Sequence, residues 1–123
     1  MKNIKQNFLG VVWPVDGIGN PDYELLRLDR WFTKRGLGQV TVRLDYSQAG
    51  VSHTHDELFK TGSLEALLPP AKRLAEEGAS SLVWACTSGS FIGGLDWAKR
   101  QVNALKDATG LPTISTTLAL IEA

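Results

Sequence analysis

Short apolar runs typical of buried strands alternate with helix-like segments along the chain, and this alternation constrains the fold more than any other feature. Residues 8–13 form a continuous apolar run that ends at Pro14, the pattern of a strand buried on both faces. Residues 39–44 alternate β-branched with polar side chains, and residues 80–85 and 111–115 supply two further runs. We therefore expect these segments to be strands.

The segments between and after these strands carry apolar residues at helical spacing. The predicted helices span residues 22–35, 64–75, 91–108 and, at the end of the chain, 116–123. Pro69 and Pro70 fall inside the second of these helices and predict an interruption or a late start. Residues 45–56 show no clear period and are predicted to form a long loop.

Strands that alternate with helices favour a parallel sheet covered on both faces by crossover connections. We expect an α/β fold, a three-layer sandwich around a four-stranded parallel sheet. A chain of 123 residues with 43% hydrophobic content can bury one modest core, so residues 1–123 are predicted to form a single domain.

The charge pattern excludes several classes of partner. Thirteen basic and thirteen acidic side chains cancel and are scattered, so we expect neither nucleic acid nor an anionic membrane as a partner, and a small neutral or anionic ligand instead. The apolar runs are far shorter than the roughly 20 residues of a membrane span, and no signal peptide is evident. A cytoplasmic location follows as an expectation, and the single cysteine cannot form an internal disulfide.

Ligands of open α/β sheets bind beyond the carboxyl ends of the strands. The loops to consider begin at Pro14, Asp45, Cys86 and Thr116. The third, Trp84-Ala-Cys-Thr-Ser-Gly-Ser-Phe-Ile-Gly-Gly94, places a thiol and several hydroxyls where a strand gives way to a helix. Helix amino termini bind carboxylates and favour thiolates, so Cys86 is a candidate base or nucleophile.

A structural role for the same residues stays open, because a cysteine after a buried strand often packs as a small hydrophobe, and Thr-Ser-Gly-Ser often caps a helix. A phosphatase-type loop is excluded because Ile92 stands where its arginine belongs, and no Walker Gly-Lys-Ser/Thr is present. His53-Thr-His-Asp56 has the His-x-His spacing of some zinc sites, but Glu57 and Leu58 do not continue such a motif. We therefore predict no metal site.

Several segments of the carboxyl-terminal half together resemble maleate cis-trans isomerases and arylmalonate decarboxylases, members of the aspartate/glutamate racemase superfamily. The segments are Ala71-Lys-Arg-Leu-Ala-Glu-Glu-Gly-Ala79, Ala85-Cys-Thr-Ser-Gly-Ser90, Ala108-Thr-Gly-Leu-Pro-Thr113 and Ser115-Thr-Thr117. The amino-terminal Gly10-Val-Val-Trp-Pro14 is compatible with the same family but less specific.

The resemblance implies a two-lobed α/β enzyme that uses no cofactor, of which this chain is equivalent to the amino-terminal lobe, with the second lobe absent. It implies that Cys86 is the catalytic thiol of this lobe, and that Thr87 and Ser88 hold a substrate carboxylate. The decarboxylases of the family carry glycine where Cys86 stands, so the residue is closer to the isomerase and racemase pattern. Further carboxylate-site candidates, for which a structural role is equally expected, are Pro14, Val15, Thr116 and Thr117.

The resemblance thus implies an isomerase or racemase lobe that acts on a small carboxylate or dicarboxylate. An arylmalonate-type decarboxylase is the nearest alternative, and a carboxylate-binding half-domain without turnover is the non-enzymatic one. In each case we expect a homo-oligomer or pairing with a second lobe, because an apolar surface where that lobe packs favours association.

Overall fold

The computed structural model describes residues 7–14, 21–47 and 54–123. The elements are, in order, β1 (Phe8–Pro14), α1 (Pro21–Lys34), β2 (Thr41–Ser47), α2 (His55–Thr61), α3 (Leu64–Glu76), β3 (Ser81–Trp84), α4 (Thr87–Phe91), α5 (Gly94–Thr109), β4 (Thr113–Ser115) and α6 (Thr116–Glu122). No helix within these ranges is both long enough and apolar enough to cross a membrane.

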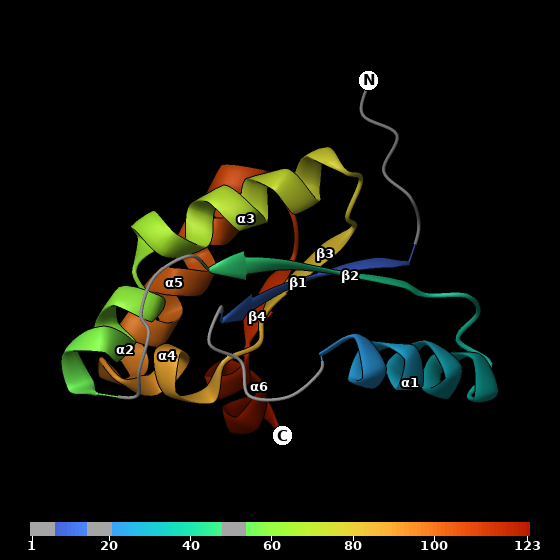
Figure 1. The fold of residues 1–123 in the computed structure, drawn as a ribbon, viewed down its shortest axis with the longest axis horizontal. Helices are drawn as coiled ribbons and strands as arrows, with labels where there is room; N and C mark the ends of the chain where they lie inside the picture. The colour runs from blue at the N-terminus through green and yellow to red at the C-terminus, as the bar shows by residue number, and fades with distance from the viewer. Residues whose placement is uncertain (1–6, 15–20, 48–53) are drawn as a thin grey trace.

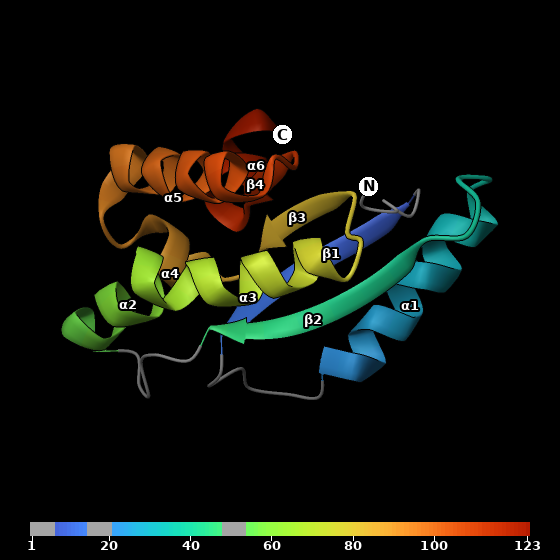
Figure 2. The ribbon, with the colours of Figure 1, turned by 90° about the horizontal axis from the view of Figure 1, so that it is seen from above.

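The four strands form one parallel sheet in the order β2-β1-β3-β4. Helices α3 and α5 pack together on one face, and α1 and α6 contact the sheet on the other (Figure 1). The predicted three-layer α/β sandwich with a four-stranded parallel sheet is therefore confirmed. Seen from above, β1 and β3 lie between β2 and β4, so the central strands have neighbours on both sides (Figure 2).

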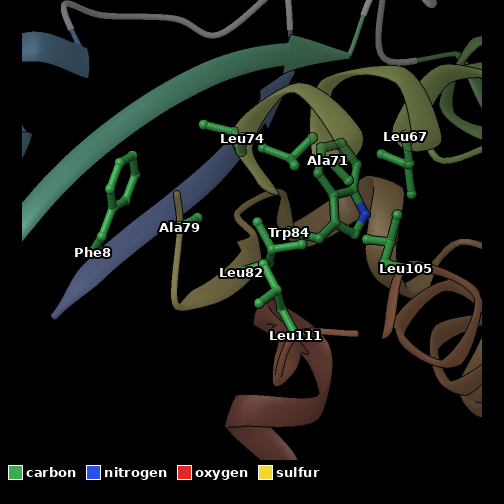
Figure 3. Packing of buried hydrophobic residues seen from close by; sticks show 10 residues of the cluster. Phe8, Leu67, Ala71, Leu74, Ala79, Leu82, Trp84, Leu105 and Leu111 are labelled. Atoms are coloured by element: carbon green, nitrogen blue, oxygen red, sulfur yellow. The ribbon is translucent and has the colours of Figure 1, made fainter. Parts of the chain in front are cut away.

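The main core lies between the sheet and the layer of α3 and α5. The Trp84 ring is completely buried, and Figure 3 shows it among Leu67 and Ala71 of α3 and Leu105 of α5. Gly10 of β1 permits this close packing, because a β-carbon there would lie 2.8 Å from Leu82 Cδ2. The core thus fixes β3, whose carboxyl end leads directly into the Cys86 loop.

The prolines do not interrupt α3, contrary to the prediction. The helix runs from Leu64 to Glu76 with Pro69 and Pro70 inside it, and the Ser63 side chain caps its amino end. Pro70 is completely buried, so apolar packing of its ring offsets the backbone hydrogen bonds that two prolines remove.

The predicted helix 91–108 is also wrong in its extent, because the structure has two helices there. Helix α4 begins at Thr87, directly after Cys86, and α5 begins at Gly94. Gly94 has φ +85°, a conformation that breaks a helix and that glycine adopts readily. The division places a short helix immediately behind the cysteine.

The prediction of a loop over residues 45–56 needs correction at both ends. Strand β2 continues to Ser47, because residues 45–47 pair with the last residues of β1. Helix α2 begins at His55 and is capped by the Thr54 side chain, while residues 48–53 lie outside the described residues.

Candidate functional site

The carboxyl ends of the parallel strands lie at one edge of the sheet, and α2 and α4 lie beyond that edge (Figure 1). Cys86 follows β3, a central strand, and the Ala85 N–H donates to the Val12 carbonyl of β1 at 3.0 Å. The thiol is thereby held beside the end of β1. A position beyond the central strands is where open α/β sheets bind ligands.

Cys86 is the amino-terminal cap of α4. Its backbone is extended, with φ −143° and ψ 119°, and the Gly89 N–H donates to its Sγ at 3.3 Å. The side chain is half-buried and packs against the hydrophobic core. The sulfur therefore has one backbone donor and keeps enough exposure to contact a small ligand.

Thr87 and Ser88 are the first two residues of α4, so their backbone N–H groups have no acceptor within the helix. Thr87 is exposed and Ser88 half-buried. Among the described residues, neither side-chain hydroxyl has a hydrogen-bond partner. Two N–H groups and two hydroxyls beside the thiol are therefore available to an anionic ligand.

Thr117 is joined to the same loop through Ser90, for which the sequence predicted no individual role. Ser90 is completely buried, and its Oγ lies 2.6 Å from Thr117 Oγ1 and 2.9 Å from the Thr87 carbonyl oxygen. The Thr117 N–H also donates to Ser90 Oγ, at 3.3 Å. Thr117 therefore supports α4 from α6, and its hydroxyl is already engaged.

The remaining predicted site residues are Thr116, Pro14 and Val15, and among the described residues neither Thr116 nor Pro14 is linked to Cys86 by a side-chain hydrogen bond. Thr116 begins α6 and its hydroxyl lies 3.4 Å from the Trp84 carbonyl oxygen, so it borders the β3 end of the site. Pro14 ends β1 and is half-buried at the same sheet edge. Val15 lies outside the described residues.

The histidine motif does not join the site within the part of the chain that the structure describes. His53 lies outside that part, and His55 begins α2 with its ring edge against Phe59, at a centroid distance of 5.0 Å. No group of three or more His, Cys, Asp or Glu side chains suited to a metal ion occurs among the described residues.

Two residues that contact α4 from α5 were not predicted from the sequence to take part in the site. Trp97 Nε1 donates to the Gly89 carbonyl at 3.0 Å, and Gln101 Nε2 donates to the same carbonyl at 2.9 Å. Gln101 stands on the apolar face of α5 beside Ala98, Val102 and Leu105, and a polar residue on an apolar face is the signal that could have revealed it.

Comparison with known proteins gives one family and several related folds. Residues 10–123 match the family model for arylmalonate decarboxylase. A search of the curated proteins found no match to the sequence.

Among solved structures, the maleate isomerase Iso from Pseudomonas putida S16 superposes with a TM-score of 0.77 at 18% identity, over 94% of this chain and 47% of that one. A liganded double mutant of arylmalonate decarboxylase superposes with a TM-score of 0.72 at 24% identity, over 95% and 45%. A Nocardia farcinica maleate cis-trans isomerase mutant with a covalently bound succinylcysteine intermediate gives 0.66 at 15%, over 94% and 46%. The chain thus spans less than half the length of these proteins.

Proposed function

The chain belongs to the arylmalonate decarboxylase family, and from this premise we propose that it is one lobe of an isomerase or racemase that acts on a small carboxylate or dicarboxylate. Cys86 is the reacting thiol, and Thr87 and Ser88 bind a substrate carboxylate. The observation that carries the proposal is the placement of Cys86 as the cap of α4, beside two hydroxyls and two N–H groups that have no hydrogen-bond partner among the residues that the structure describes.

The chemistry follows from where negative charge develops. Deprotonation next to a carboxylate and addition of a thiolate to maleate both move an electron pair toward carboxylate oxygens. Donors fixed in advance stabilise that charge, and loss of one such donor typically costs about 3 kcal/mol in the transition state. The amino end of α4 supplies donors of this kind next to the sulfur.

Thiol addition is the favoured form of the reaction for an alkene diacid. The Cys86 sulfur forms a bond to one alkene carbon while the electron pair of the double bond moves toward the far carboxylate. Rotation about the resulting single bond, followed by loss of the thiolate, converts a cis into a trans alkene. A covalently bound succinylcysteine in the Nocardia farcinica isomerase supports this form of chemistry.

A second lobe or a second copy of this chain completes the site in our proposal. Large apolar side chains are exposed on α4, α5 and α6, three helices that contact one another. These side chains are Phe91, Leu95, Leu120 and Ile121, between 46% and 67% exposed. Exposed apolar groups on adjoining elements favour association.

Decarboxylation of a malonate is the alternative reaction, and the comparisons, which include both arylmalonate decarboxylases and maleate isomerases, do not favour it over isomerisation. In the third possibility the loop binds carboxylates without turnover. Product analysis separates these possibilities: maleate gives fumarate with an isomerase, a chiral carboxylate loses its optical rotation with a racemase, an arylmalonate gives carbon dioxide with a decarboxylase, and a binding module gives none of these changes.

The proposed role of Cys86 is tested by the Cys86→Ala variant in a preparation that shows turnover. We expect turnover to be abolished while carboxylate binding persists, because the donors of Thr87 and Ser88 remain. An unchanged rate in Cys86→Ala disproves the thiol mechanism.

A further inference from the structure

Gln101 is a buried polar residue whose side chain joins two separate parts of the backbone. It is 1% exposed, and its Nε2 donates to the Gly62 carbonyl at 2.8 Å and to the Gly89 carbonyl at 2.9 Å. Gly62 follows α2 and Gly89 lies in α4. One carboxamide on α5 therefore holds the corner after α2 against the helix that carries the Cys86 loop.

The two glycines make this junction possible through close approach. A β-carbon on Gly62 would overlap the Gly89 carbonyl oxygen and lie 2.7 Å from Gln101 Nε2. A β-carbon on Gly89 would lie 2.9 Å from the Trp84 ring and 3.1 Å from Cys86 Sγ. The backbone of α4 is thus confined between the Gly62 corner, the core tryptophan and the thiol.

Gly89 links this closely packed segment to the sulfur through its hydrogen bonds. Its N–H donates to Cys86 Sγ, while its carbonyl accepts both Gln101 Nε2 and Trp97 Nε1. Displacement of the Gly89 carbonyl reorients its peptide units, and a nearby N–H donates efficiently only within a narrow range of angles.

We infer that Gln101 is a positioning residue for Cys86, because it holds Gly89 in the orientation that directs its N–H toward the thiol. This inference rests on the function proposed above for Cys86. It assigns to α5 a role in the site, although the hydrogen bonds of Gln101 among the described residues go to the Gly62 and Gly89 carbonyls and not to the sulfur.

The chemistry of the side chain explains why glutamine occupies the position. A primary amide has two N–H donors on one nitrogen, which suits two carbonyl acceptors, whereas methionine of similar length has none and asparagine is one methylene shorter. Gln101 Oε1 is buried without a partner among the described residues. Burial of an unpartnered oxygen is unfavourable, so the donors, rather than apolar packing, account for a glutamine here.

The test measures amide hydrogen exchange at Gly89 and Ser90 in the Gln101→Met variant, alongside exchange in strands β1 and β3. We expect exchange at Gly89 and Ser90 to accelerate by about tenfold relative to the strands, because two hydrogen bonds to α4 and its neighbour are lost. We also expect the Gly89 amide proton resonance to move upfield as its hydrogen bond to the sulfur weakens.

The matched control is Ser80→Ala. The Ser80 hydroxyl also makes two hydrogen bonds to backbone, with the Phe8 N–H at 2.9 Å and the Phe8 carbonyl at 3.0 Å, at the opposite end of the sheet. Loss of the Ser80 hydroxyl should accelerate amide exchange at Gly89 and Ser90 no more than it accelerates exchange in strands β1 and β3. Equal relative exchange at Gly89 and Ser90 in the two variants overturns the inference.

Two further variants keep the test decisive if Gln101→Met folds poorly. Trp97→Phe preserves a large ring and removes one donor to the Gly89 carbonyl, and should accelerate exchange at Gly89 about threefold. Gly62→Ala pushes on the same carbonyl and should shift the Gly89 amide resonance. No response at Gly89 in either variant also overturns the inference.

Failure of the proposed function is recognised separately. If maleate does not protect Cys86 of the unsubstituted chain from alkylation, the carboxylate site is disproved. The exchange comparison does not use a ligand, so its outcome still decides whether Gln101 positions Gly89.

Discussion

The Gly89 N–H donates to the Sγ of Cys86 at 3.3 Å, three residues along the chain. Side-chain oxygens of serine, threonine, asparagine and aspartate usually accept such a bond at helix amino ends, and here a sulfur takes the oxygen's place. Cys86 therefore caps α4 and presents its sulfur at the carboxyl edge of the sheet. The same geometry stabilises the helix and places the sulfur where the proposed reaction requires it.

Ser90→Ala should lower the free energy of unfolding by about 1–3 kcal/mol, because it removes a completely buried hydroxyl and leaves the Thr87 carbonyl and the Thr117 N–H without their partner. Ser88→Ala is the control, since its hydroxyl has no partner among the described residues, and it should change stability by less than about 0.5 kcal/mol. Urea unfolding of both variants measures the difference. Equal stability of the two would mean that Ser90 does not join α4 to α6.

Thr87→Ala should weaken binding of a small dicarboxylate by about tenfold while the fold remains intact, because we propose that the exposed hydroxyl donates to the ligand, and it has no hydrogen-bond partner among the described residues. Titration calorimetry with maleate provides the measurement. Thr113→Ala, at the opposite end of β4, is the control and should bind normally. Unchanged affinity in Thr87→Ala removes this hydroxyl from the site.

Acid should weaken the link between β2 and α3. Asp45 accepts Arg73 Nε at 2.7 Å and Arg73 Nη2 at 2.8 Å, and these hydrogen bonds lower the pKa of the Asp45 carboxyl. A lowered pKa means that the pair stabilises the fold above the unfolded-state pKa of about 3.9, and that this contribution is lost as the pH falls through the lower folded-state value.

The measurement for this pair is the difference in unfolding free energy between the unsubstituted chain and Asp45→Asn. Because the Arg73 side chain is half-exposed, we expect this difference in unfolding free energy to be at most about 1 kcal/mol at pH 6. The difference should shrink toward zero as the pH falls well below 4. A difference that does not vary with pH would show that the charge of Asp45 contributes nothing.

Pro69→Ala should stabilise the chain by about 1–2 kcal/mol, because it restores a backbone donor inside α3 and the Pro69 ring is exposed. Pro70→Ala should give a smaller gain or a loss, since that ring is completely buried. Thermal unfolding compares the two. A larger gain for Pro70→Ala would contradict the packing role assigned to its ring.

The sheet and the position of Cys86 could be predicted because both depend on local patterns. Apolar runs of strand length identified β1 and β3, and a polar, glycine-containing run after β3 marked the loop that holds Cys86. Parallel strands bring their carboxyl ends to one edge by geometry alone. Thr117 could be placed near the site for the same reason, although its bond to Ser90 could not.

Local signals in the sequence could have prevented two of the errors, the missed start of α2 and the missed break between α4 and α5. Thr54 followed three residues later by Glu57 is the pattern of a capping box, and it marks the start of α2 within a segment that lacked apolar periodicity. Gly93 and Gly94 mark the break between α4 and α5. Apolar periodicity is continuous across that break, so the period alone predicted one helix.

The position of Gln101 on the apolar face of α5 could have marked it as a buried polar residue, but its partners could not be identified, because they are backbone carbonyls 39 and 12 residues away. A carbonyl belongs to every residue type, so no side-chain pattern announces such a bond. The uninterrupted α3 has a similar origin, since burial of Pro70 against the core is a tertiary effect that helix propensity does not contain.

The central claim is that Cys86 and the amino end of α4 form a carboxylate site, and the alkylation rate of Cys86 by iodoacetamide tests it most directly. Cys86 is the chain's one cysteine, so the modification is unambiguous. We predict that millimolar maleate slows alkylation several-fold, that the uncharged diamide of maleate does not, and that Thr87→Ala reduces the protection. Equal rates with and without maleate in the folded chain would contradict the claim.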